Sequence, residues 1–146
     1  MMYIFDTSVL VAALRSQRGA SFVILQALRA GLLKGGASTA LLLEYEDVLK
    51  REVNLQHFWV SGDEVDVVLG VLATVLQPIV IDFRWRPQLS DPNDEMVLEC
   101  AVNGQASAIV TFNARDFLPM ASRFGVEILA PNVLIQRLNL VERLGL

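Results

Sequence analysis

Short runs of β-forming residues alternate with stretches of helical periodicity along the 146-residue chain. Because strands that alternate with helices usually form parallel sheets, this pattern predicts an α/β fold with a central, mostly parallel sheet flanked by helices. Strands are expected over residues 2–5, 36–39, 79–81, 108–111 and 127–129. Helices are expected from residue 7 onward and over 19–33, 41–53, 61–76, 92–104 and 132–140, with long connections over 83–90 and 112–125. No repeat or linker divides the chain, so one domain over 1–146 is expected.

The chain is unusually apolar, with 53% hydrophobic residues and a mean hydropathy of +0.46. This composition excludes a disordered chain and suggests that some apolar surface meets a partner. The helix expected over 61–76 is apolar around most of its circumference, which predicts burial in the chain's own core or against another chain. Neither the N-terminus nor any apolar run has the form of a signal peptide or a membrane span, so we expect a cytoplasmic protein.

Net charge argues at first against a nucleic-acid partner, because it is −4 with a pI of about 4.9 and phosphate contacts favour a basic surface. A site that holds a divalent metal ion needs many acids, however, and the bound ion changes the sign of the local charge. The basic residues are ten Arg and only two Lys, and Arg is the better bidentate phosphate ligand.

Several acids are expected at one edge of the sheet. Asp6 directly follows the first strand, while Asn113 and Asp116 follow the fourth, and sites in open α/β sheets form at the carboxyl ends of the strands. Helical periodicity places Glu44 and Asp94 beside the buried faces of their helices and turns Glu95 and Glu99 outward. Each acid also has a local explanation, such as an N-cap for Asp6 and Asp91 or a turn for Asp116, but capping does not require a common location.

Four segments in order resemble the PIN domain, and more narrowly the VapC group of bacterial toxins: IFDTSVLVAAL, LLLEYEDVLKR, DPNDEMVLECA and IVTFNARDF. The resemblance spans nearly the whole chain and implies a three-layer PIN-like fold and a nuclease that cuts RNA with Mg²⁺ or Mn²⁺. It also implies an antitoxin partner. We also expect a homodimer, both from the resemblance and from the apolar surface that the composition suggests. The catalytic and metal-binding acids that match are Asp6, Glu44, Asp94 and Asp116.

The neighbours of these acids also match, and Ser8, Thr111, Asn113 and the N-cap Asp91 are expected to support them. Whether Asn113 or Asp116 is the fourth acid position stays open, with Asp116 favoured. Arg15, Arg18 and Arg115 are plausible phosphate contacts at the same end of the fold.

Three other interpretations of the chain stay open. The first is a PIN-like module that binds RNA or protein with little or no catalysis. The second is a phosphoacceptor domain, which needs an acid pair at the first strand and a lysine near the end, whereas the only lysines are Lys34 and Lys50. The third is an apolar interaction domain whose acids are all caps.

Overall fold

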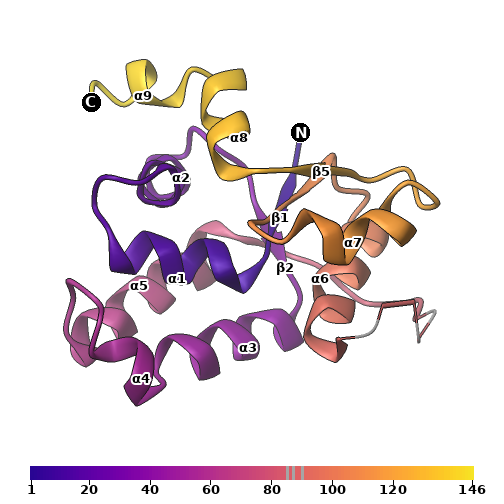
Figure 1. Ribbon diagram of the computed structural model, residues 1–146, viewed down its shortest axis with the longest axis horizontal. Helices are drawn as coiled ribbons and strands as arrows, with labels where there is room; N and C mark the ends of the chain where they lie inside the picture. The colour runs from indigo at the N-terminus through magenta and orange to yellow at the C-terminus, as the bar shows by residue number, and fades with distance from the viewer. Residues whose placement is uncertain (85, 87, 90) are drawn as a thin grey trace.

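The computed structural model describes residues 1–84, 86, 88–89 and 91–146. Helices and strands alternate along the chain, as the sequence pattern predicts (Figure 1). In order, the elements are β1 (Tyr3–Phe5), α1 (Thr7–Arg15), α2 (Ala20–Arg29), β2 (Gly36–Ala37), α3 (Thr39–Leu49), α4 (Glu52–Leu55), α5 (Gly62–Val75), β3 (Gln77–Pro78), α6 (Pro92–Asn103), β4 (Ala108–Val110), α7 (Ala114–Ala121), β5 (Glu127–Leu129), α8 (Pro131–Arg137) and α9 (Leu140–Arg143).

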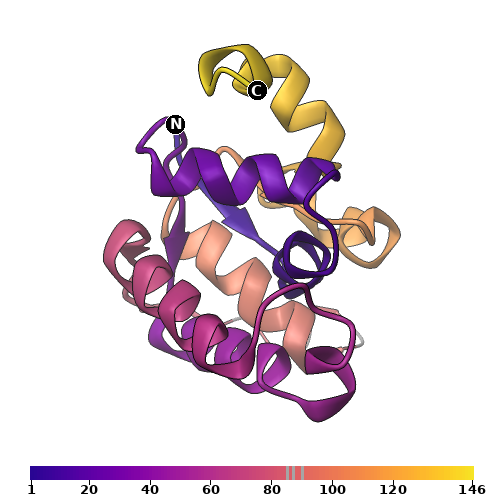
Figure 2. The ribbon, with the colours of Figure 1, turned by 90° about the vertical axis from the view of Figure 1, so that its left-hand side faces the viewer.

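The strands are parallel, and helices cover both faces of the sheet that they form. β1, β4 and β5 pair in the order β1-β4-β5, and β2 pairs with β3. A parallel bridge between Tyr3 and Gly35 joins the two pieces. In Figure 2, β1 lies between α2 on one side and α6 on the other. The predicted fold class, a parallel sheet flanked by helices, is therefore confirmed.

The third strand lies two residues earlier than expected, because Pro78 belongs to it. The N–H of Gln77 donates to Gly35 (2.8 Å) and the N–H of Ile79 donates to Ala37 (3.0 Å). In this parallel pairing only alternate residues donate toward β2, so a proline between them costs no ladder hydrogen bond. Pro78 thus both ends α5 and occupies the sheet edge.

Three expected segments differ in their helical content. The connection expected over 112–125 contains α7, which buries Phe117 and Ala121 one turn apart. The closing helix is divided into α8 and α9, because Asn139 adopts the left-handed conformation (φ 52°) between them. The helix expected over 41–53 begins two residues earlier and is divided into α3 and α4 at Lys50 and Arg51.

Helix α5 is less buried than its apolar circumference predicts. Of its side chains only Val65 and Leu72 are buried, and Val67 is 66% exposed. Ser61 and Glu64 form a capping box at the start of α5. Among the described residues, no helix combines the length and the apolar character needed to cross a membrane.

Candidate active site

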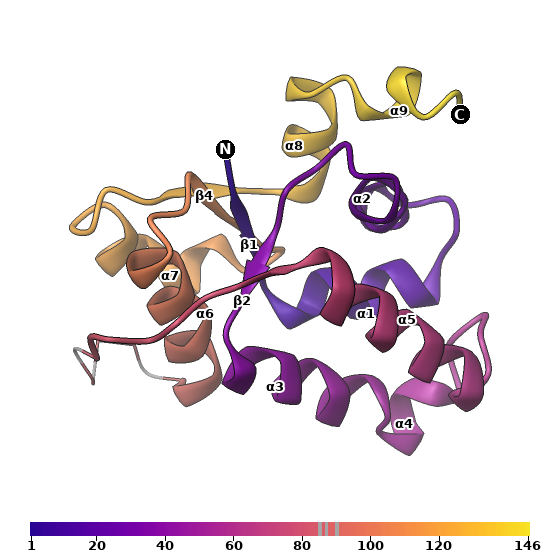
Figure 3. The same ribbon diagram turned by 180° about the vertical axis from the view of Figure 1, so that it is seen from behind.

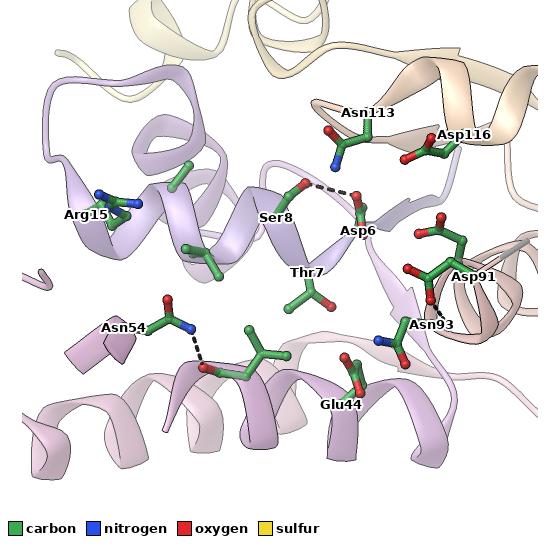
Figure 4. A pocket seen from close by; sticks show the side chains of 14 residues that line it. Asp6, Thr7, Ser8, Arg15, Glu44, Asn54, Asp91, Asn93, Asn113 and Asp116 are labelled. Atoms are coloured by element: carbon green, nitrogen blue, oxygen red, sulfur yellow. Dashed lines mark hydrogen bonds between the residues drawn. The ribbon is translucent and has the colours of Figure 1, made fainter. Parts of the chain in front are cut away.

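Five acids line one open cleft at the carboxyl edge of the sheet. The cleft has a volume of about 480 Å³ and lies between α1, α3 and the N-terminal ends of α6 and α7 (Figure 4). β1 and β4 are parallel neighbours, so the residues that follow them meet at the same edge. The acids of the cleft are Asp6, Glu44, Asp91, Asp94 and Asp116, and its other lining residues are Thr7, Ser8, Val11, Ala12, Arg15, Val48, Asn54, Asn93 and Asn113.

Asp6 is the most buried of these acids, at 8% exposed. Although it occupies the N-cap position of α1, its side chain makes no capping hydrogen bond. Its Oδ2 instead accepts hydrogen bonds from the hydroxyl groups of Thr111 (2.7 Å) and Ser8 (2.9 Å). Thr111 Oγ1 also accepts the backbone N–H of Asn113 (2.9 Å). Because both described donors reach Oδ2, Oδ1 is the oxygen that is available to a ligand.

Asp94 lies in the first turn of α6, where Pro92 and the N-cap Asp91 set the start of the helix. Asp91 accepts the N–H of Asn93 (2.9 Å), so its expected capping role is confirmed. Partial burial is the largest cause that raises the pKa of Asp94, and together with the negative charges of Asp6, Asp91 and Asp116 it brings this pKa to about 6. This repulsion acts between four carboxylates that all line the same cleft.

Glu44 reaches the cleft from α3, a helix that is hydrogen-bonded to the end of β1. Burial raises the pKa of Glu44, as do the charges of Asp47, Asp91 and Asp6, while Arg51 lowers it. The neighbouring residue, Tyr45, is fully buried, and its hydroxyl donates to the carbonyl of Phe5 (2.5 Å). This hydrogen bond ties α3 to the end of β1, one residue before Asp6.

The three arginines expected near the site are placed differently. Arg15 lines the cleft at the end away from Asp91 and Asp116 (Figure 4). Arg18 and Arg115 are exposed and do not line it. Asn113 and Asp116 both line it, so the structure keeps both as candidates for the fourth position.

Sequence reasoning missed four polar or structural residues of this region. Asn93 is exposed and lines the cleft beside Asp94. Thr7 and Asn54 also line the cleft, and no sequence signal marks them. Tyr45 is buried with the apolar residues of α3; a buried tyrosine needs a partner for its hydroxyl, and that need is the signal that predicts such a bond.

The donor chemistry of the cleft suits a hard divalent cation. Its charged ligands are all carboxylates, and no His or Cys lines it. Within the described part of the chain, however, no three His, Cys, Asp or Glu side chains are grouped closely enough to hold one ion between them. An ion here would therefore keep water ligands beside one or two carboxylates, which is how Mg²⁺ is usually bound.

Comparison with known proteins places the chain in a family. The family model for the PIN domain matches residues 2–115, so the chain belongs to the PIN domain family, whose members are generally nucleases. Among solved structures, it is similar to a chain of VapBC2 from Rickettsia felis, solved bound to a DNA fragment from its promoter. The identity is 16%, the TM-score is 0.60, and the match covers 89% of this chain and 98% of that one. No curated protein matches the chain.

Proposed function

We propose that the protein is a divalent-metal-dependent endoribonuclease and the toxin component of a toxin–antitoxin pair. The observation that carries this proposal is the convergence of Asp6, Glu44, Asp94 and Asp116 on one cleft from four separate parts of the chain. The PIN domain match supports the nuclease class. The raised pKa of Asp94 supports a cation in the cleft, because a positive charge would relieve the repulsion among these carboxylates.

Each acid would have its own role in binding the ion. Asp6 and Asp94 would bind Mg²⁺ or Mn²⁺ directly, Asp116 would complete the site or orient water, and Glu44 would bind a second ion or position the nucleophile. When bound, the ion supplies activation of water and neutralisation of the phosphate charge.

Supporting residues fix the orientation of these acids. Ser8 and Thr111 hold Oδ2 of Asp6, which would leave its other oxygen to bind the ion. Such partners are needed because a ligand that rotates freely binds a metal less tightly. Asp91 caps α6 and keeps Asp94 in the first helical turn. Asn113, whose N–H donates to Thr111, would contact either water or substrate.

Arginine side chains would bind the RNA backbone. Arg15 lines the end of the cleft away from Asp91 and Asp116, so it would contact a phosphate some distance from the bond that is cut. Arg18, in the turn after α1, and Arg115, at the start of α7, are exposed and would extend this contact outside the cleft.

The test is cleavage of mixed RNA by the purified chain, free of any partner, with Mg²⁺, with Mn²⁺ and with excess chelator. Asp6→Asn is compared with the wild type and with Asp63→Asn, which changes an exposed acid of α5 outside the cleft. Metal-dependent cleavage that Asp63→Asn retains and Asp6→Asn loses supports the proposal. Equal cleavage by wild type and Asp6→Asn would overturn it.

The net charge of −4 favours one second candidate, a PIN-like module that binds RNA or protein without efficient cleavage. An acidic surface weakens RNA binding and therefore turnover. RNA or protein binding without cleavage in any metal would identify this function.

Two partners belong to the proposal. An antitoxin would bind the protein in the cytoplasm; the similarity to a chain of VapBC2 supports this part of the proposal. A second copy would cover an apolar groove of about 680 Å³ beside the edge strand β3. Leu43 and Val80, 60% and 73% exposed, line this groove and would lie at the centre of a homodimer face.

A further inference from the structure

Two acids of α6 point away from the cleft and are nevertheless buried. Glu95 is 4% exposed and Glu99 is 6% exposed, although helical periodicity predicts that both face outward. They are covered by the segment that joins β3 to α6, here called the strap, which comprises the described residues 82–84, 86, 88 and 89. In Figure 3 the chain that follows β3 runs out past α6.

Three side chains on one face of α6 hold the strap, at intervals of one helical turn: Asn103, Glu99 and Glu95. Asn103 accepts the N–H groups of Asp82 (3.0 Å) and Phe83 (2.9 Å) and donates to the carbonyl of Phe83 (3.0 Å). The strap has no helix or strand in its described residues, so these side chains satisfy backbone groups that regular structure would otherwise satisfy.

The two glutamates make the remaining contacts. Glu99 forms a bidentate ion pair with Arg86, at 2.7 Å to one nitrogen and 2.9 Å to the other. Oε1 of Glu95 accepts the N–H groups of Gln88 (2.5 Å) and Leu89 (2.6 Å), and its second oxygen lies 3.9 Å from Nε of Arg86. Because burying carboxylates is costly, and apolar residues at such positions are often at least as stabilising, these acids are better explained by what they position than by stability.

The strap leads to the cleft. Leu89, held by Glu95, lies two residues before Asp91, which lines the cleft and caps α6. The backbone of Glu95 itself donates to the carbonyl of Asp91 (3.2 Å). Glu95 therefore holds the residues just before the helix start through its side chain, and it bonds the N-cap residue Asp91 through the regular hydrogen bond of the first helical turn.

We propose that Glu95 and Glu99 are positioning residues that hold the strap against α6 and thereby keep Asp91 and Asp94 in place to receive the metal ion. The metal part rests on the proposed function; the placement of the helix start does not. Partners that orient a metal ligand from outside typically change metal affinity about 10-fold to 100-fold when removed.

The test compares three variants of the full chain. Glu95→Ala removes the acceptor, Glu95→Gln keeps an oxygen at the same place, and Leu72→Ala destabilises the core on α5, a helix whose residues do not line the cleft. The first readout, made without metal, is hydrogen exchange of the Asn93 amide, which donates to Asp91. The second is Mn²⁺ affinity by calorimetry.

We expect Glu95→Ala to speed exchange at Asn93 and to weaken Mn²⁺ binding by about 10-fold, while Glu95→Gln restores both. Leu72→Ala should change neither, because an amide at a helix end exchanges by local opening and not by global unfolding. Equal exchange in Glu95→Ala and wild type would overturn the proposal. Faster exchange with no Mn²⁺ binding even by the wild type would uphold the positioning role and contradict the proposed metal-dependent function.

Discussion

At the scale of single residues, the acids of the cleft are costly to the fold that holds them. Asp94 is partly buried among like charges, and the pKa of its carboxyl is raised from 3.8 to about 6. A raised pKa means that the folded state disfavours the charged form. The stability that the protonated acid provides is complete below pH 3.8 and is lost as the pH rises through about 6.

Asp94→Asn should therefore stabilise the metal-free protein at pH 7.5 by about 1 kcal/mol, a value reduced from the full pKa shift because the side chain is partly exposed to solvent. The same variant should lose the stabilisation that Mn²⁺ gives to the wild type. Thermal unfolding with and without Mn²⁺ measures both effects. The gain should vanish at pH 4, where Asp94 is protonated in the wild type; a gain that persists there would contradict this explanation.

The hydroxyl of Thr111 orients Asp6 and allows a nearly isosteric test. Thr111→Val removes the donor to Oδ2 while it keeps the shape of the side chain, and we expect Mn²⁺ affinity to fall by about 10-fold. Thr74→Val is the matched control, because the hydroxyl of Thr74 donates to the carbonyl of Gly70 on the exposed side of α5, away from the cleft. Calorimetry of the three proteins would contradict the assignment if both variants bind alike.

At the scale of elements, α3 is fixed to the sheet by the hydroxyl of one tyrosine. Tyr45→Phe leaves the carbonyl of Phe5 without this buried donor and should cost about 1–3 kcal/mol of unfolding free energy. It should also lower RNA cleavage, because Glu44 lies on the same helix. Tyr3→Phe is the control, since among the described residues the hydroxyl of Tyr3 has one hydrogen-bond partner, the weakly accepting sulfur of Met1 at 3.5 Å. Urea unfolding gives the energies; equal midpoints would contradict the prediction.

The elements show how far sequence reasoning extends. The alternation of β-forming runs with stretches of helical periodicity predicted the parallel α/β class, because the spacing of buried residues follows directly from the type of secondary structure. The predicted boundaries of elements were wrong where a tertiary contact determines them. Pro78 belongs to β3 because the sheet edge needs no N–H from it. The buried side chain of Phe117 anchors a helix in a segment that was expected to be a loop. Glu95 and Glu99 were assigned to solvent, because helical periodicity does not show that an irregular segment returns to cover them.

The candidate site was predictable for a related reason. Residues that follow parallel strands meet at one edge whatever the details of packing, so Asp6, Asn113 and Asp116 could be placed together from the sequence. Asn54 and Thr7 could not, because they line the cleft only through the way that α1 and α4 are oriented.

At the scale of the whole molecule, the apolar groove beside β3 predicts self-association. Leu43→Arg and Val80→Arg place charge in this groove and should each convert a dimer to a monomer, because a buried unpaired charge opposes association. Val141→Arg on α9, also an exposed valine, should leave the dimer intact. Light scattering after size exclusion measures the mass; a wild-type monomer, or a dimer in all three variants, would contradict this face.

The order of the strands has a consequence for how such a protein is made. Asp6 is fixed by Thr111, and the backbone of Thr111 is fixed in turn by Leu129, whose carbonyl accepts its N–H (3.0 Å). A ribosome that has translated the first hundred residues has produced Asp6, Glu44 and Asp94 but not the residues that complete their site. Under the proposed function, a nascent chain that stops before Thr111 and Leu129 lacks the groups that fix Asp6, and RNA cleavage would begin only after these residues have been made.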